Sequence, residues 1–235
     1  MTMNAKAFSF DMRRLTRDPI LMMFMVVPFL ALAAVKLFLI FGEPILNVKT
    51  GFVLSPYYGY ILAVVLTFSP YILGTVTAFL MIDERDESIY ELMSVLPIGY
   101  VGYITNRLLI PFSLSIIYTV LSYILLDIFQ LSLLQVILIA LLSGIQSIVV
   151  SLIMFSLADN KVQGLTYSKA LNIFVFAALA DLLGLKWVST ISAFIPFYWT
   201  TQLVIDPANL IVISKGLLVH SAWLYLGTRL VKRRR

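Results

Sequence analysis

Long apolar runs separated by short polar stretches dominate the chain. A membrane-spanning helix needs about 20 mostly apolar residues to cross roughly 30 Å of hydrocarbon. Five runs meet or approach that length, at positions 20–41, 57–82, 108–126, 131–157 and 210–230. The pattern therefore predicts an all-α, polytopic integral membrane protein in which each of these runs crosses once.

The stretch 171–205 is not one continuous apolar run of spanning length. Its first 15 residues would rise only about 22 Å as an α-helix, which is short for a crossing, and Pro196 interrupts the rest. Two crossings here would put the two basic ends of the chain on opposite sides. One crossing plus a re-entrant segment, allowed where protein covers the backbone, puts both ends on one side. We expect the second arrangement, with six spans and a broken fifth span.

Positive charge supports this arrangement. The chain has 17 Lys and Arg against 12 Asp and Glu. In the six-span arrangement most of these basic residues share the side of the termini, and the opposite loops keep only Lys49 and Lys186. Basic residues are retained on the cytoplasmic side, so both termini are expected there. Basic clusters that flank spans in this way argue against nucleic acid as a partner.

Composition narrows the class of protein further. The chain is 61% apolar and 12% charged and has no cysteine. Soluble domains are roughly 45–50% apolar and about 25% charged, so a soluble domain is excluded. The lack of cysteine excludes a disulfide scaffold and thiolate metal sites. The 235 residues are expected to form a single transmembrane domain.

Common motifs of catalysis are absent from the sequence. The sequence has no G-x-x-x-x-G-K-[ST] loop, no H-E-x-x-H pair, no G-x-S-x-G motif and one histidine. We therefore expect no catalytic, metal or cofactor site and no enzyme activity in this chain alone. A membrane enzyme acting on lipids remains an alternative, although it would need converging acid, base or metal ligands. A non-transporting membrane scaffold is another.

Polar residues within the spans are candidates for packing or for a pathway. They are Lys36, Gln146, Asn172, Asp181, Lys215 and His220. Such groups are costly in a bilayer and usually face protein or a wet cavity. Two interpretations of Asp181 stay open: all three of Asp181, Lys36 and Lys215 reach the outer interface, or Asp181 forms a neutralising pair with one of the two lysines.

Two further features of the spans favour helix packing. His220 has no partner nearby in sequence and is expected to bond to a neighbouring helix rather than to transfer protons. Serines at positions 143, 147 and 151 form a small-residue stripe. Such a stripe suits close helix packing, with the lining of a path as the alternative.

A charged segment, 83–107, follows the second span and is expected in water. It opens with an acidic motif, Asp83, Glu84, Arg85 and Asp86. Apolar residues then recur at i, i+3, i+4 and i+7, as expected for one helical face, at Ile89, Leu92, Met93 and Leu96. Such a helix suits a groove in a partner protein, or could fold back on its own bundle.

The amino-terminal segment is predicted to be an elbow helix within residues 1–19. Phe8, Met12 and Leu15 share one face, and basic residues occupy the others. A basic amphipathic helix of this kind lies at the headgroup boundary. The Asp18-Pro19 pair ends it.

Taken over its whole length, the chain resembles the permeases of type-two ABC exporters, most closely small bacterial fluoroquinolone-export permeases. The acidic motif with Glu87 is the most specific part of the resemblance. The other parts are Arg17-Asp18-Pro19, Pro97-Ile98, Tyr103-Ile104 with Arg107, Ser168-Lys169 and the run Ile195-Pro196-Phe197-Tyr198-Trp199.

The resemblance implies a function as well as a fold. In that family, two six-span permeases, identical or related, pair with two ATPase subunits that bind ATP and Mg²⁺. The helix after the second span is the cytoplasmic coupling helix. Carried over, the residues that contact the ATPase are Glu87, Ile89, Tyr90, Leu92, Met93 and Leu96. The resemblance also implies a bacterial inner membrane and export of a small amphipathic molecule, such as a drug, by alternating access.

Overall fold

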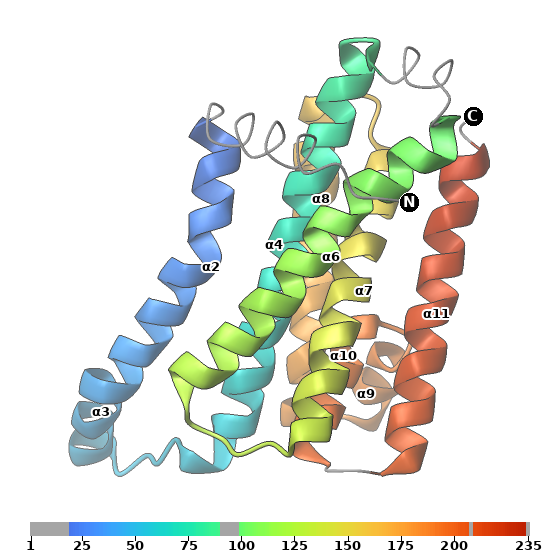
Figure 1. The fold of residues 1–235 in the computed structure, drawn as a ribbon. Helices are drawn as coiled ribbons and strands as arrows, with labels where there is room; N and C mark the ends of the chain where they lie inside the picture. Colours follow the sequence, from blue (N-terminus) through green and yellow to red (C-terminus); the bar gives the residue numbers. More distant parts are fainter. Residues whose placement is uncertain (1–18, 90–98, 207–208, 234–235) are drawn as a thin grey trace.

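All the regular structure in the part of the chain that is described, residues 19–89, 99–206 and 209–233, is helical. Figure 1 shows the computed structural model. Its first half contains α2 (Pro19–Leu37), the π-helical turn η1 (Phe38–Gly42), α3 (Glu43–Thr50), η2 (Ser55–Tyr57), α4 (Tyr58–Asp86) and α6 (Gly99–Leu126). Its second half contains α7 (Leu133–Leu157), α8 (Lys161–Asn172), the 3₁₀ helix η3 (Ile173–Leu183), α9 (Lys186–Ser192), α10 (Pro196–Ile205) and α11 (Leu210–Arg233).

Among the described residues, six single helical segments are long and apolar enough to cross a membrane, as predicted. They are 26–50, 55–86, 99–126, 133–157, 161–183 and 210–233. Both ends of the described chain, in α2 and α11, lie at the same end of the bundle (Figure 1), which we call the termini side. The opposite end is called the far side. The predicted elbow helix lies outside the described residues.

The first span is longer than predicted. Instead of ending at residue 41, the helix continues through η1 and α3 to Thr50. Pro44 lacks a backbone N–H and its ring would clash with the carbonyl four residues earlier. The wider π turn just before it accommodates this defect, with the Glu43 N–H bonded to the Phe38 carbonyl oxygen. Gly51, at a φ of 69°, then ends the helix.

The charged segment after the second span is also more helical than predicted. The acidic motif forms the last turn of α4, and residues 99–107 form the first turns of α6. The expectation that all of 83–107 lies in water is wrong, because Glu84 is only 1% exposed. A helix end can bury charges when they are paired, and the pairing is described below.

The fifth span begins earlier than predicted, within the polar segment that precedes residue 171. α8 begins at Lys161, where the Asn160 side chain caps it by accepting from the Gln163 N–H. α8 then continues directly into η3. A 3₁₀ helix rises about 2.0 Å per residue rather than 1.5 Å. The 23 residues from 161 to 183 therefore reach about 40 Å and are long enough to cross without the re-entrant residues.

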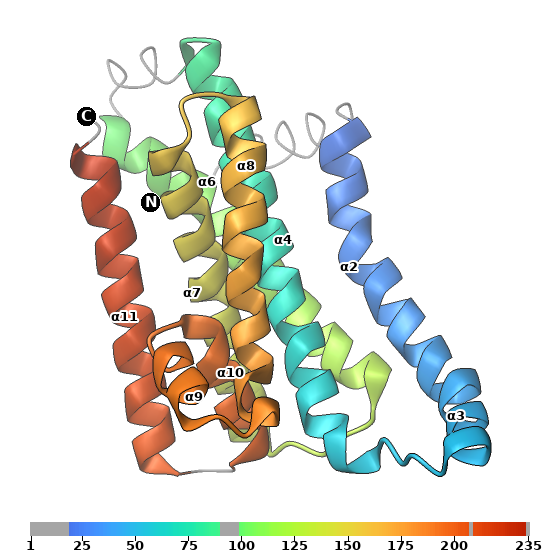
Figure 2. The ribbon, with the colours of Figure 1, turned by 180° about the vertical axis from the view of Figure 1, so that it is seen from behind.

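The re-entrant segment is the pair α9 and α10, bent by 114° at residues 193–195. η3 ends on the far side and α11 begins there, so the hairpin enters and leaves on that side (Figure 2). Pro196 at the first turn of α10 fits the break, since the first turn is the position in a helix that accommodates proline without losing a backbone hydrogen bond.

The centre of the bundle is the contact between α4 and α7. The apolar windows of these two spans are 83% and 67% buried, against 11% for the first span. Small residues let them approach closely. Ser143, Ser147 and Ser151 are fully buried, and the Ser151 hydroxyl donates to the Gly74 carbonyl oxygen across the contact (2.9 Å). The packing interpretation of the serine stripe is confirmed.

Gly74→Ala is expected to destabilise the bundle. The added Cβ would lie 2.6 Å from the Ser147 carbonyl oxygen and 2.8 Å from the Val150 Cβ. Overpacking of this kind costs about 1–3 kcal/mol, which outweighs the gain of about 1 kcal/mol in helix propensity. The measurement is the melting temperature in detergent, followed by size-exclusion chromatography.

Gly216→Ala is the matched control, because a Cβ there would lie 3.4 Å from its nearest neighbour, an ordinary contact. It should leave the melting temperature unchanged or raise it. Equal melting temperatures for the two variants would contradict the close approach of α4 and α7.

Candidate functional site

The acidic motif forms the centre of the candidate site, at the termini side of the bundle. Three consecutive residues of the motif contact three different helices. They are Asp83, Glu84 and Arg85, which contact α8, α6 and the end of α7 in that order. Successive residues of an α-helix are separated by about 100°, so one turn of α4 can reach several helices at once.

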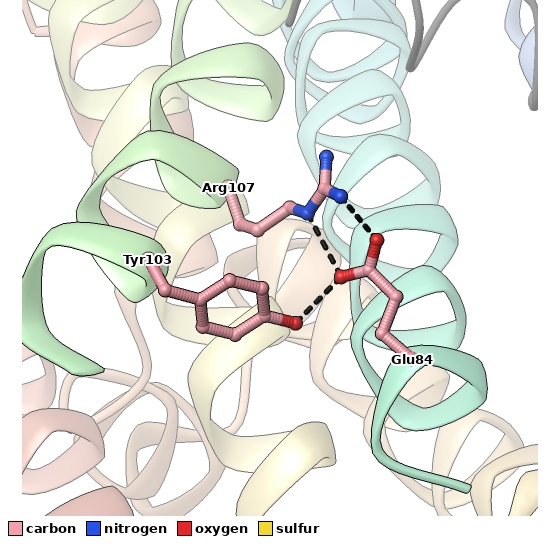
Figure 3. Close-up of polar contacts among 3 residues, drawn as sticks. All are labelled: Glu84, Tyr103 and Arg107. Carbon is pink, nitrogen blue, oxygen red and sulfur yellow. Dashed lines mark hydrogen bonds and ion pairs between the residues drawn. The ribbon is translucent and has the colours of Figure 1, made fainter. Parts of the chain in front are cut away.

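Glu84 makes the most buried contact of the three. Its Oε2 accepts a hydrogen bond from the Tyr103 hydroxyl (2.5 Å) and one from Arg107 Nε (2.9 Å). Its Oε1 forms an ion pair with Arg107 Nη2 (Figure 3). The Arg107 side chain is 15% exposed. Both carboxylate oxygens are thus bonded, as a buried charge requires, and α4 is held to α6.

Asp83 and Arg85 hold α4 to the next two helices. Asp83 Oδ2 lies 2.9 Å from Lys161 Nζ, at the start of α8. The Arg85 guanidinium donates to the carbonyl oxygens of Ala158 (2.6 Å) and Phe155 (3.3 Å) and lies 5.0 Å from the Phe155 ring centroid. These carbonyls end α7, where the helix dipole favours a cation. We call the contacts of Asp83, Glu84 and Arg85 the clamp.

The predicted coupling-helix residues lie directly after the clamp. Glu87 is exposed, Ile89 is half-buried, and Ser88 between them has a φ of 58°. A non-glycine residue rarely adopts this conformation, and it marks a sharp change of chain direction after α4. Tyr90, Leu92, Met93 and Leu96 lie outside the described residues, so their role stays a prediction.

A second polar cluster lies deep in the bundle. The Gln146 amide nitrogen donates to Thr200 Oγ1 (2.8 Å) and lies 3.0 Å from His220 Nε2. His220 Nδ1 lies 2.7 Å from the Gly216 carbonyl oxygen. Since a carbonyl only accepts, Nδ1 carries the proton and Nε2 accepts from Gln146. The prediction that His220 bonds to a neighbouring helix is confirmed, and the cluster joins α7, α10 and α11.

Asp181 pairs with neither Lys36 nor Lys215, so the pairing interpretation is wrong. Its carboxylate accepts from the Tyr198 hydroxyl (3.2 Å) and from the Gln202 amide (2.5 Å), both on α10. Lys36 instead donates to the Leu126 carbonyl oxygen (2.8 Å) at the end of α6, and Lys215 is exposed. The 3₁₀ winding of η3, with 3.0 residues per turn, turns Asp181 toward the re-entrant hairpin.

The remaining polar candidate, Asn172, is half-buried where α8 changes into η3 and makes no side-chain capping bond there. It does not join either cluster. Within 19–89, 99–206 and 209–233, no group of three or more His, Cys, Asp or Glu is placed to share a metal ion.

Comparison with known proteins identifies a family for the chain. A family model described as "Fluoroquinolones export permease protein Rv2686c-like" matches residues 11–228. The chain belongs to this permease family. Two relatives are the fluoroquinolones export permease proteins MT2760 and Rv2686c, from two strains of Mycobacterium tuberculosis. Each is 29% identical over 196 residues, which cover 82% of this chain and 77% of the relative. No solved structure matches the chain.

The clamp of this permease could be predicted only in part from sequence. The acidic motif was evident, but its partners Tyr103, Arg107 and Lys161 are far away in the sequence. One signal was available: Tyr103 and Arg107 are four residues apart, so they share one face of a helix. That spacing could have identified them as two ligands of a single carboxylate.

Glu84→Ala is expected to cost the permease about 3–5 kcal/mol of stability, because it leaves the Arg107 guanidinium buried without its counter-charge. The double variant Glu84→Leu with Arg107→Leu should recover part of this loss, since no charge then remains buried. The measurement is the free energy of unfolding in mixed detergent micelles.

Asp83→Ala is the control within the same turn. Its ion pair is more exposed, with side-chain exposures of 21% for Asp83 and 35% for Lys161, so the loss should be at most about 1 kcal/mol. Equal losses at Asp83 and Glu84 would show that burial does not set the strength of the clamp.

Proposed function

We propose that this permease is the membrane subunit of an ATP-driven exporter that moves a small amphipathic molecule out of a bacterial cell by alternating access. ATP and Mg²⁺ bind a separate ATPase subunit, as the resemblance to type-two ABC exporters implies. This subunit docks on the segment that follows α4.

The observation that carries the proposal is the position of the clamp. The docking segment leaves α4 directly after the clamp and rejoins the bundle at the start of α6. The ends of α4 and α6 are joined by Glu84 and Arg107, and α4 is joined to α7 and α8 by Arg85 and Asp83. A displacement of the segment would therefore move four helix ends together, because a buried ion pair resists separation.

The proposed substrate and membrane follow from the relatives. Proteins named for fluoroquinolone export are 29% identical to this chain, so an amphipathic drug is the proposed cargo. The proposed location is the bacterial inner membrane, with the termini side in the cytoplasm, in line with the basic residues of that side.

A second permease copy, identical or related, completes the proposed transporter. The first span supports it: only 11% of its apolar window is buried, and it lies at the edge of the bundle (Figure 1). Its contact with α6 includes Phe29 and Tyr118, whose ring centroids are 4.4 Å apart. A partner copy and two ATPase subunits would give the stoichiometry that the resemblance implies.

Leu92→Asp tests the docking of the ATPase. The helical pattern puts Leu92 at the centre of the apolar face of the predicted coupling helix, and a charge there should oppose burial against a protein groove. We expect normal membrane insertion, at least roughly tenfold less copurified ATPase and loss of drug export. The measurements are copurification and drug accumulation in cells.

Ser94→Asp is the matched control, because it adds the same charge on the opposite face of the predicted helix. It should retain docking and export. Full ATPase copurification with Leu92→Asp would exclude this segment as the coupling element.

The proposed orientation gives a separate prediction. Reporter fusions after Arg235 and within the loop that follows Lys49 should report opposite sides of the membrane, with Arg235 in the cytoplasm. The fold places the end of α11 on the termini side and α3 on the far side (Figure 1). The same side for both reporters would contradict the six-span arrangement.

A further inference from the structure

A groove runs between α6 and α11 on the termini side, with α7 beneath it. Its volume is about 460 Å³. The residues that line it include Val101, Ile104 and Leu108 of α6, Leu152 of α7, and Val231 and Lys232 of α11. The volume lies within the range of about 300–1,000 Å³ typical of small-molecule sites.

The groove is amphipathic along its length. Its lining is mostly apolar, and Lys232 is the one charged residue of the described lining. Lys232 lies in the last turn of α11, at the end of the bundle. From Val101 to Leu108 the α6 wall extends about 10 Å, less than the roughly 15 Å of hydrocarbon in one leaflet.

Among the hydrogen-bond donors of the groove lining, Lys232 is the charged one. The Thr105 hydroxyl donates to the Val101 carbonyl oxygen and the Thr228 hydroxyl to the Tyr225 carbonyl oxygen, each at 2.8 Å. Both donors are thus used within their own helices. The Lys232 ammonium, with three donors on a flexible stem, makes no ion pair with a described carboxylate.

We propose that this groove binds one anionic phospholipid from the leaflet on the termini side. An acyl chain lies along the apolar lining, and the phosphate accepts hydrogen bonds from Lys232. Basic pockets between membrane helices bind anionic headgroups in this way. The charge complementarity selects an anionic lipid over a zwitterionic one with the same chains.

The test is native mass spectrometry of the full chain in detergent, titrated with phosphatidylglycerol or with phosphatidylcholine of identical chains. We expect one phosphatidylglycerol adduct per chain that forms at lower concentration than the phosphatidylcholine adduct. Lys232→Gln should weaken that adduct roughly tenfold or more, through loss of a charge-assisted hydrogen bond, and should remove the preference between the lipids.

Arg233→Gln is the matched charge control, because Arg233 is the next residue of α11 and does not line the groove. It should weaken binding about fivefold or less, the effect of one surface charge near an anionic lipid. Equal effects of Lys232→Gln and Arg233→Gln would overturn the proposal, since general attraction to the basic tail would then explain the binding.

A second pair of variants tests the groove itself. Thr105→Phe places a ring in the groove and should abolish the first adduct of either lipid, while Leu109→Phe, outside the lining, should retain it. Retention of the phosphatidylglycerol adduct by Thr105→Phe, in protein that elutes as the folded species, would also overturn the proposal. Neither an ATPase nor a drug is needed, so failure here is distinct from failure of the exporter proposal.

Discussion

The ion pair between Glu84 and Arg107 is the contact on which the termini side of the bundle depends. Removing two charges from water costs several kcal/mol for each ion, and only complete hydrogen bonding compensates for it. The structure provides this bonding through Tyr103 and two nitrogens of Arg107. A pair of this kind tolerates little displacement, so α4 and α6 must keep their register where they meet.

The rest of the clamp extends this constraint to other helices. Arg85 bonds to the carbonyl end of α7, and Asp83 pairs with the first residue of α8. Each contact lies at a helix end, where a charged side chain is close to unpaired backbone groups and to the helix dipole. A charged motif beside a membrane span thus serves as a structural joint, and in the proposed exporter the same joint would transmit the motion of the ATPase.

The far half of the bundle is held by side-chain hydrogen bonds. Gln146 joins α7 to Thr200 on the re-entrant hairpin and to His220 on α11. Asp181 fixes the end of η3 to Tyr198 and Gln202 of the same hairpin. In a bilayer the hydrophobic effect contributes little to the association of helices, because the lipid tails are as apolar as the helix surfaces. Hydrogen bonds and close packing therefore orient the helices. The hairpin is therefore anchored on two sides without crossing the membrane.

The sequence by itself determined the fold class, the number of spans in the described residues and the shared side of the two ends of the described chain. Span length and apolar content follow directly from the thickness of the hydrocarbon, and a re-entrant piece followed from the short run at 171–185. The acidic motif was also evident from sequence, as the richest charged segment. These features depend on local composition, which a single sequence contains.

Only the tertiary structure decided which polar groups meet. Glu84 reaches Arg107, 23 residues away, and Asp181 reaches α10 rather than either lysine. Two spans also differ from the sequence prediction. A π turn accommodates Pro44, so the first span continues past it. The 3₁₀ winding of η3 changes the length of the fifth span and the direction in which its side chains point. Such choices depend on the rotation and depth of one helix against another, and residue spacing within a single helix does not encode them.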